Sequence, residues 1–344
     1  MKILRYIVLA AGCIIWTVGL SPSILPWLWK EQVVEDGYQY GDLYKLSNLP
    51  EFRDPRHQCT GYTPPARPQS AKKVHLYVIG DSFTEKGRVE KKDFPVDEYT
   101  WVKWSDFLHI KLDTTEHNIL LIESVERHFR QKFASSPLTV LVPDTATFLR
   151  NGAPAKFMYR LDEAFKGSHT ADRLDGFLFQ NDFVLRMKEW KADFNHRFFN
   201  RVGTGVTLVN GDRDIVYYMD TDTPHITSAF TPVRATEVDS MITNLNASRD
   251  FADSLGFDNV LLSIIPNKVS VLSPDYGGQY NNLIERVYNH PKLDIPYVDV
   301  LADFRRMGRS AYLKGDSHWT CEGQTLWLNK INALINRLVV APTS

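Results

Sequence analysis

Four short apolar runs restrict this chain to an α/β fold. They are VHLYVIG at 74–80, NILLIES at 118–124, NVLLSIIP at 259–266 and YVDVL at 297–301. Each run is almost continuously apolar instead of alternating, which is typical of parallel strands buried on both faces. Because stretches with helical patterning separate the runs, the sequence predicts an α/β domain with a mostly parallel sheet.

Helices are expected between these runs, at 101–109, 124–133, 235–255, 281–290 and 322–338. The last is amphipathic, because its apolar residues recur three or four positions apart: Leu326, Trp327, Ile331, Leu334, Ile335 and Leu338.

The predicted catalytic domain covers residues 74–340. Residues from about 138 to 230 interrupt the alternation and are interpreted as an insertion in that domain, in which Asn210-Gly211 predicts a hairpin turn. Before the domain, residues 31–73 are predicted to be a spacer, since prolines are frequent there and Pro-rich segments are extended and semi-rigid.

A long uncharged run from Ile7 to Trp29 follows two basic residues, Lys2 and Arg5. At about 1.5 Å per residue it is long enough to cross a hydrocarbon layer of about 30 Å. The basic residues precede it, so the positive-inside rule predicts a cytoplasmic N-terminus and an external body. Residues 1–30 are therefore expected to form a single-pass signal anchor. A cleaved signal peptide is the alternative, since Pro22 and other prolines weaken the distal half of the helix.

The bulk composition excludes some classes of function. The chain is 43% hydrophobic and 24% charged with a net charge of -1, which gives no basic surface for nucleic acid. Its three cysteines lack the paired spacing of a zinc site, so no metal is expected. Cys59 and Cys321 form a disulfide in an oxidising compartment or stay as two buried thiols; the sequence leaves both readings open.

The tripeptide Gly-Asp-Ser occurs twice, at 80–82 and at 315–317. Ser82 directly follows the strand predicted at 74–80, and ligand sites of open α/β sheets gather at the carboxyl ends of strands. We therefore expect Ser82 to be a nucleophile. The alternative is a strand-to-helix turn in which Asp81 or Ser82 only caps the next helix.

The second copy supplies what a serine nucleophile requires. A serine hydroxyl needs an imidazole base, which is itself oriented by a carboxylate. Asp316 and His318 are one residue apart on the loop before the last predicted helix. This spacing predicts an acid–base pair with Ser317 as the spacer. Alternatively, His318 only enters the helix, with Asp316 or Thr320 as its cap.

These two blocks resemble the SGNH/GDSL hydrolase superfamily, which has an early Gly-Asp-Ser block and a late acid–histidine block before its C-terminal helix. The Asp-x-His-Trp spelling at 316–319, with GDSF at 80–83, IESVERHF at 122–129 and IIPNK at 264–268, is similar to the SGNH-like branch of alginate and exopolysaccharide O-acetyltransferases. The resemblance covers most of residues 74–338. It implies a three-layer α/β/α domain and a Ser82-His318-Asp316 triad without metal or diffusible cofactor.

The chain departs from that branch in two respects. Alginate acetyltransferases carry the acid–histidine block before the serine block, whereas the order here is that of ordinary SGNH proteins. In addition, no G-x-N-D block is present, so the asparagine of the oxyanion hole is not assigned.

Four further residues are candidates for substrate or oxyanion contacts. Arg127, just past the second strand, has a cationic or orienting role or is a surface arginine. Lys268 contacts substrate or is solvated. Tyr312 and Trp319 flank the acid–base loop and stack on a sugar ring or belong to the core.

Together these features predict a membrane-anchored O-acyltransferase that transfers acetyl groups to a cell-surface or exported polysaccharide in the periplasm or outside the cell. The resemblance implies a multipass membrane acyltransferase partner that supplies the acyl group. An extracytoplasmic esterase or deacetylase and a noncatalytic glycan-binding or assembly subunit remain the alternatives.

Overall fold

The structure is a computed structural model, and it describes residues 2–36, 38–68, 72–135, 138, 140–143, 161, 165 and 169–340. The chain divides into two compact units. The first, here called the anchor unit, combines Met1–Pro55 with Thr145–Gly203, and the second, the sheet unit, combines Arg56–Asp144 with Thr204–Ser344. The predicted spacer at 31–73 and the predicted insertion at about 138–230 are therefore each divided between the two units.

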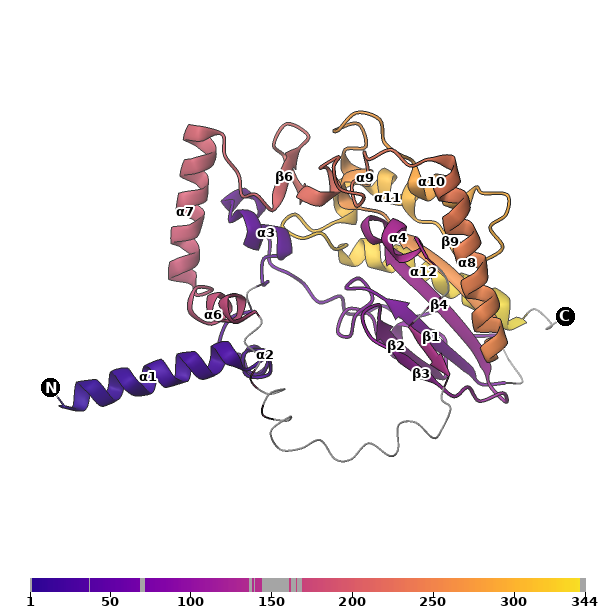
Figure 1. Ribbon diagram of the computed structural model, residues 1–344, viewed down its shortest axis with the longest axis horizontal. Helices are drawn as coiled ribbons and strands as arrows, with labels where there is room; N and C mark the ends of the chain where they lie inside the picture. The colour runs from indigo at the N-terminus through magenta and orange to yellow at the C-terminus, as the bar shows by residue number, and fades with distance from the viewer. Residues whose placement is uncertain are drawn as a thin grey trace. The chain divides into compact units, whose positions relative to one another are not determined.

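The sheet unit is built on a five-stranded sheet in the order β2-β1-β4-β8-β9, with every neighbouring pair parallel (Figure 1). The strands are β1 (Val74–Gly80), β2 (Glu98–Lys103), β4 (His117–Val125), β8 (Asn259–Ile265) and β9 (Tyr297–Val298). Every residue of β4 is buried, as expected for a central strand covered on both faces. The predicted α/β class with a mostly parallel sheet is confirmed.

The strand order predicts where a ligand site lies. Following the chain, β2 is added on one side of β1, and β4, β8 and β9 are then added one after another on its other side. This is a doubly wound order, and its direction reverses between β1 and β4. Ligand sites in such sheets lie at the carboxyl ends of the strands beside that reversal. The segments after Gly80 and Val125 meet there.

Helices of the sheet unit contact the edges and faces of this sheet, with α8 against β8 and α12 against β9. They are α4 (Glu126–Lys132), α8 (Ala235–Leu255), α9 (Lys268–Leu272), α10 (Leu283–Tyr288), α11 (Leu301–Met307) and α12 (Cys321–Val340), with short 3-10 turns η2 (Lys91–Asp93), η3 (Tyr218–Asp220) and η4 (Gly308–Ala311). In α12 the predicted apolar face is the buried one, since Trp327, Ile331 and Ile335 are inaccessible.

Two small sheets complete this unit. Strands β3 (Leu108–Ile110) and β5 (Leu141–Pro143) are parallel, whereas β6 (Val206–Val209) and β7 (Asp214–Tyr217) form an antiparallel hairpin. In the hairpin loop Asn210 and Gly211 both have positive φ, at 57° and 64°, which is the backbone conformation that favours Asn-Gly in tight hairpin turns. The predicted hairpin is confirmed.

The helix expected at 101–109 is wrong. Residues 98–103 form the edge strand β2 beside β1, and 108–110 form β3. Aromatic and β-branched residues in EYTWVK favour a strand, and the hydrogen bonds to β1 stabilise this strand over the predicted helix. The fourth run is also shorter than expected, because α11 already begins at Leu301.

The anchor unit is helical over its described residues. It contains α1 (Lys2–Leu20), α2 (Ile24–Lys30), α3 (Asp42–Ser47), η1 (Pro50–Phe52), α6 (Thr170–Leu178) and α7 (Asp182–Phe199). Part of the predicted spacer is packed here instead of extended, since Leu43, Leu49 and Phe52 are buried.

One helix of the described chain, over Ile3–Leu20, is long and apolar enough to cross a membrane, with a mean hydropathy of 2.0. It begins earlier and ends earlier than the predicted run from Ile7 to Trp29. A break at Ser21–Ser23 separates it from α2, because Pro22 lacks the N–H that a continuous helix requires. By length and composition α1 is consistent with a single-pass anchor.

Candidate active site

Ser82 lies in the turn that follows β1, at the carboxyl edge of the sheet, and is partly exposed. The turn depends on Gly80. A Cβ at that position would overlap Thr84 Oγ1 and come within 3.0 Å of both Glu123 Oε2 and Trp101 Nε1. Only glycine therefore allows the backbone to pass so close to the end of β4.

Asp81 fixes this turn to the end of β4. Its backbone N–H donates to Glu123 Oε2 at 2.9 Å, and its carboxylate accepts from Val125 N at 2.8 Å and from Phe83 N at 3.1 Å. The carboxylate is thus occupied by backbone donors. We infer that Asp81 orients the serine turn and that the acid partner of a triad has to come from elsewhere.

His318 and Asp316 reach Ser82 from the loop before α12. His318 Nε2 lies 2.8 Å from Ser82 Oγ, and His318 Nδ1 lies 2.5 Å from Asp316 Oδ1. Since an ionised carboxylate only accepts, Nδ1 carries the proton and Nε2 is the acceptor for the serine hydroxyl. Asp316 Oδ1 also accepts from the backbone N–H of His318 at 2.9 Å. The three side chains form one continuous hydrogen-bonded chain.

The electrostatics of Asp316 suit this arrangement. Burial alone would raise the pKa of Asp316, but the hydrogen bond and charge of His318, together with the charge of Arg88, hold that pKa well below its usual range. Arg56 also lies close, with Nε 3.8 Å from Asp316 Oδ2. The carboxylate therefore stays ionised, and it can stabilise a positive charge on the imidazole.

Lys268 holds the loop that carries Asp316 and His318 by hydrogen bonds to its backbone. This side chain is only 2% exposed, and its Nζ donates to three backbone carbonyls of the loop: Leu313 at 2.7 Å, Lys314 at 2.8 Å and Asp316 at 3.2 Å. The predicted substrate contact is therefore replaced by another role. Lys268 faces the interior of the protein and shapes the loop that carries the acid and the base.

The two aromatic candidates also face inward. Tyr312 and Trp319 are 3% and 4% exposed, and their backbones form a bridge that closes the base of the loop. Tyr312 donates its hydroxyl to Pro266 O at 2.6 Å, and Trp319 packs edge-on against Phe83 with the ring centroids 5.0 Å apart. Buried rings have no free face for a sugar, so the core reading applies to both.

Arg127 lies at the start of α4, beside the carboxyl end of β4, and is not a freely solvated arginine. Its Nε is 3.2 Å from the buried Asp220 and 3.4 Å from Asn267 Oδ1, and its guanidinium lies over the ring of Tyr217. Asn267 accepts also from the backbone N–H of Arg127 at 3.1 Å. Its own Nδ2 is buried and makes no hydrogen bond to the described residues.

Cys59 and Cys321 form a disulfide, with their Cα atoms 5.1 Å apart. The bond joins the segment that carries Arg56 to the first residue of α12, directly after the acid–base loop. Sequence reasoning missed Arg56. Pairing of the two cysteines would have indicated that Arg56 and Asp316 are close, because Arg56 is three residues before Cys59 and Asp316 is five residues before Cys321.

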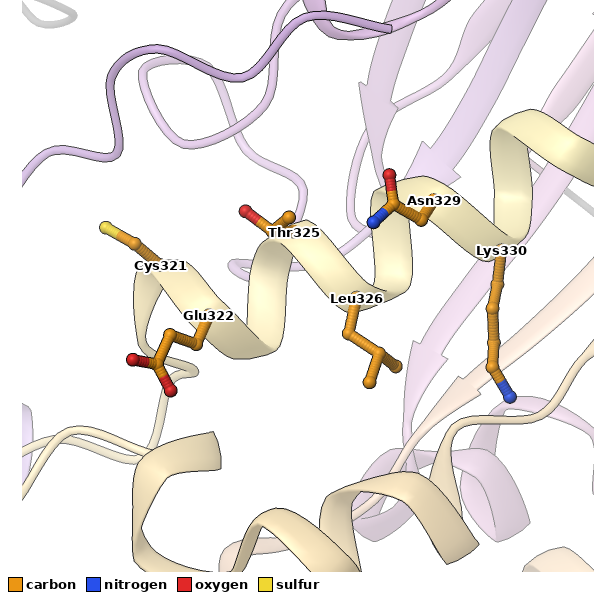
Figure 2. A pocket seen from close by; sticks show the side chains of 6 residues that line it. All are labelled: Cys321, Glu322, Thr325, Leu326, Asn329 and Lys330. Atoms are coloured by element: carbon orange, nitrogen blue, oxygen red, sulfur yellow. The ribbon is translucent and has the colours of Figure 1, made fainter. Parts of the chain in front are cut away.

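A surface depression of about 590 Å³ follows the outer side of α12 (Figure 2). It is lined by Cys321, Glu322, Thr325, Leu326, Asn329 and Lys330, all from the first turns of that helix. In Figure 2 Glu322, Leu326 and Lys330 extend from one side of the helix. None of the triad residues lines this depression, so we do not assign it to the same site.

The arrangement around Ser82 can support nucleophilic chemistry: the serine is partly buried, a base lies within hydrogen-bond reach of its hydroxyl, and a buried carboxylate orients the base. The function has to be inferred from this chemistry, since the chain matches no protein-family model, no curated protein and no solved structure.

Proposed function

We propose that this chain is a membrane-anchored O-acyltransferase of the SGNH type, with a three-layer α/β/α domain, that transfers acetyl groups to a cell-surface or exported polysaccharide. The observation that carries the proposal is the continuous hydrogen-bonded chain of Ser82, His318 and Asp316 at the carboxyl edge of the sheet. The position of Ser82 beside the reversal of strand order supports it as well.

In the proposed first half-reaction, Ser82 Oγ attacks the carbonyl carbon of the acyl donor while His318 Nε2 takes the hydroxyl proton. Asp316 stabilises the resulting imidazolium. In the turn after β1 the N–H groups of Asp81, Phe83 and Thr84 donate within the protein, so the backbone N–H of Ser82 is the proposed donor to the tetrahedral oxyanion, and the Arg127 guanidinium is the proposed cationic contribution. The intermediate then collapses, the leaving group takes the proton from His318, and an acyl ester remains on Ser82.

In the second half-reaction His318 Nε2 removes the proton of a sugar hydroxyl, whose oxygen attacks the carbonyl carbon of the acyl ester; the bond to Ser82 Oγ then breaks as His318 returns the proton to Ser82 Oγ. Water in place of the sugar would give an esterase. The same residues serve both outcomes, so acceptor binding decides between a transferase and a hydrolase. We favour transfer because the acid–histidine block resembles the acetyltransferase branch.

Two features support a location of the catalytic domain outside the cytoplasm. The apolar helix α1 is able to anchor the chain in a membrane, and the Cys59–Cys321 disulfide suits an oxidising compartment. An acyl group made in the cytoplasm then has to cross the membrane, and we propose that a multipass acyltransferase partner delivers it.

Covalent labelling tests the nucleophile. The purified protein is treated with a fluorophosphonate probe, and we expect labelling in the wild type and none in Ser82→Ala. Ser317→Ala tests the second Gly-Asp-Ser copy, and Ser105→Ala, an exposed serine of the sheet unit, is the matched control. Labelling that persists in Ser82→Ala at the wild-type rate removes Ser82 from the mechanism.

A second measurement separates the candidate functions. The protein is given an acetyl ester donor with and without polysaccharide, and acetyl groups on the polysaccharide are compared with free acetate. Transfer to polysaccharide supports the transferase, and acetate alone supports the esterase. A deletion strain whose polysaccharide acetylation is restored by Ser82→Ala would instead favour a noncatalytic assembly subunit.

A further inference from the structure

Helix α7 of the anchor unit exposes a continuous apolar stripe. Its most exposed large side chains are Phe183 at 73%, Trp190 at 74% and Phe198 at 71%. Met187 and Phe194, which lie between them, are exposed too. All five are separated by three or four residues, so they share one face of the helix along nearly its whole length.

The opposite face of α7 is the one that packs on the protein. Leu185 and Glu189 are its buried residues, and Glu189 accepts hydrogen bonds from Tyr44 of α3 and from Arg53 just after η1. In an ordinary surface helix of a soluble domain the outward face is polar. Here the outward face is aromatic, so water is not the medium that this helix is suited to face.

Basic residues border the stripe. At about 100° per residue, Arg186 and Arg197 fall at one edge of the apolar face, where Arg197 pairs with Asp193 at 2.7 Å, and Lys191 falls at the other edge. All three are exposed. An aromatic face bordered by cations on both sides is typical of helices that lie in the interface of a membrane, where the rings enter the acyl boundary and the cations contact anionic headgroups.

The same compact unit holds the candidate membrane span. Helix α6, which is joined to α7 by Phe179–Asn181, packs against α1. Arg173 of α6 donates to the carbonyls of Gly19 and Leu20, at 2.7 and 3.4 Å, and so satisfies the C-terminal end of α1. Helix α6, to which α7 is joined by three residues, is therefore attached to α1 at the point where that helix would leave the membrane.

The direction of α7 agrees with a position on the membrane. Figure 1 shows α7 running crosswise to α1, with α3 on one side of α7 and the N-terminal part of α1 extending on the other side. The buried face of α7 packs on α3, so its apolar stripe is turned away from α3. A helix crosswise to a membrane span lies along the membrane surface.

We propose that α7 is an interfacial helix that docks the anchor unit onto an anionic phospholipid surface, at the face of the membrane where α1 ends. The occupant of the stripe is lipid, with phosphate headgroups beside Arg186 and Lys191 and acyl chains beside the rings. This inference rests on α1 as a membrane span and is independent of the chemistry at Ser82.

Site-directed spin labelling of the full chain tests it. The protein, with Cys13→Ser to remove the free thiol, is reconstituted in phosphatidylcholine vesicles with and without phosphatidylglycerol. Nitroxides are placed at Trp190→Cys and, for comparison, at Ser240→Cys on the exposed surface of α8. Collision rates are measured with oxygen, which concentrates in lipid, and with a nickel chelate, which stays in water.

We expect the label at position 190 to be accessible to oxygen and shielded from nickel, and more so with phosphatidylglycerol, while the label at 240 shows the reverse. Equal nickel accessibility at both positions overturns the proposal. Shielding from both reagents at 190 also overturns it, because a protein surface, from a second copy or another partner, would then cover the stripe.

A variant adds a second readout. With the label at Met187→Cys, the change Phe183→Ser/Trp190→Ser/Phe198→Ser is expected to expose the label to nickel, because losing three rings lowers the docking equilibrium by ~100-fold or more. The matched control is Phe107→Ser, an exposed aromatic of the sheet unit, which should leave the label shielded. These side chains are exposed, so their loss leaves the packed faces of the helices intact.

Discussion

Replacing Lys268 by methionine tests whether the acid–base loop is positioned from within the protein. Methionine keeps the unbranched apolar stem and removes the ammonium group. Its three hydrogen bonds to the carbonyls of Leu313, Lys314 and Asp316 are then lost. The change leaves Ser82, His318 and Asp316 in place, because Lys268 is buried and faces the loop backbone.

The magnitude follows from what happens to each carbonyl. A hydrogen bond from a charged group contributes about 1.5–3 kcal/mol, and a buried acceptor left without a donor costs about 1–3 kcal/mol. Leu313 is half-buried and Lys314 is exposed, so water can replace the ammonium at those two carbonyls. Asp316 is buried, and its carbonyl bears the full loss. We therefore expect the free energy of unfolding to fall by about 2 kcal/mol.

The larger effect is expected on reactivity. A displacement of about 1 Å at a catalytic group costs on the order of 100-fold in rate. We expect Lys268→Met to slow fluorophosphonate labelling of Ser82 by that factor, and to lower kcat on an acetyl ester with little change in KM. Lys268→Arg, which keeps the charge and the donors, should restore part of the rate. Lys314→Met, an exposed lysine of the same loop, is the matched control. Wild-type labelling by Lys268→Met would refute the positioning role.

Two further predictions concern stability. Replacing both Cys59 and Cys321 by serine should lower the free energy of unfolding by about 4 kcal/mol, because the disulfide closes a long loop; calorimetry with and without reductant checks this, and an unchanged melting temperature would contradict it. Burial, followed by the charges of Asp220 and Glu285, raises the pKa of Glu126 to about 7. The folded state therefore holds a proton that the unfolded state releases above pH ~4.5, so this group lowers stability as pH rises from ~4.5 to ~7, by up to about 3 kcal/mol. Melting of Glu126→Gln should lose that part of the pH dependence, and identical slopes in variant and wild type would argue against it.

An element could be predicted from the sequence where its own residues determine it, and not where it depends on contacts with distant residues. The strand at 74–80 was predicted with its final bounds, because a central strand buried on both faces is apolar at nearly every position. β2 was missed, since its assignment depends on pairing with β1 and its own pattern is ambiguous. The break after Leu20 was underestimated for a related reason: hydropathy continues through Pro22, but the hydrogen bonding of the helix does not.

The site shows the same division. Asp316 and His318 are neighbours in sequence, so their pairing was predictable from spacing alone. The role of Lys268 was not predictable, because its partners are backbone carbonyls of a distant loop. Every residue has a backbone carbonyl, so residue types give no indication of such a contact. The burial of Trp319 likewise depends on Phe83 and α12, which only the fold brings together.

The polar residues at the end of β4 explain how the site is aligned. Glu123 and Glu126 are both buried. Glu123 accepts from the turn that carries Ser82, and Glu126 accepts from the backbone N–H of Asn267 at 2.8 Å, directly before Lys268. The end of β4 and the start of α4 thus hold the turn of Ser82 on one side and the segment before Lys268 on the other. These hydrogen bonds join the ends of β1, β4 and β8, and so align the turn of Ser82 with the lysine that supports the loop of His318.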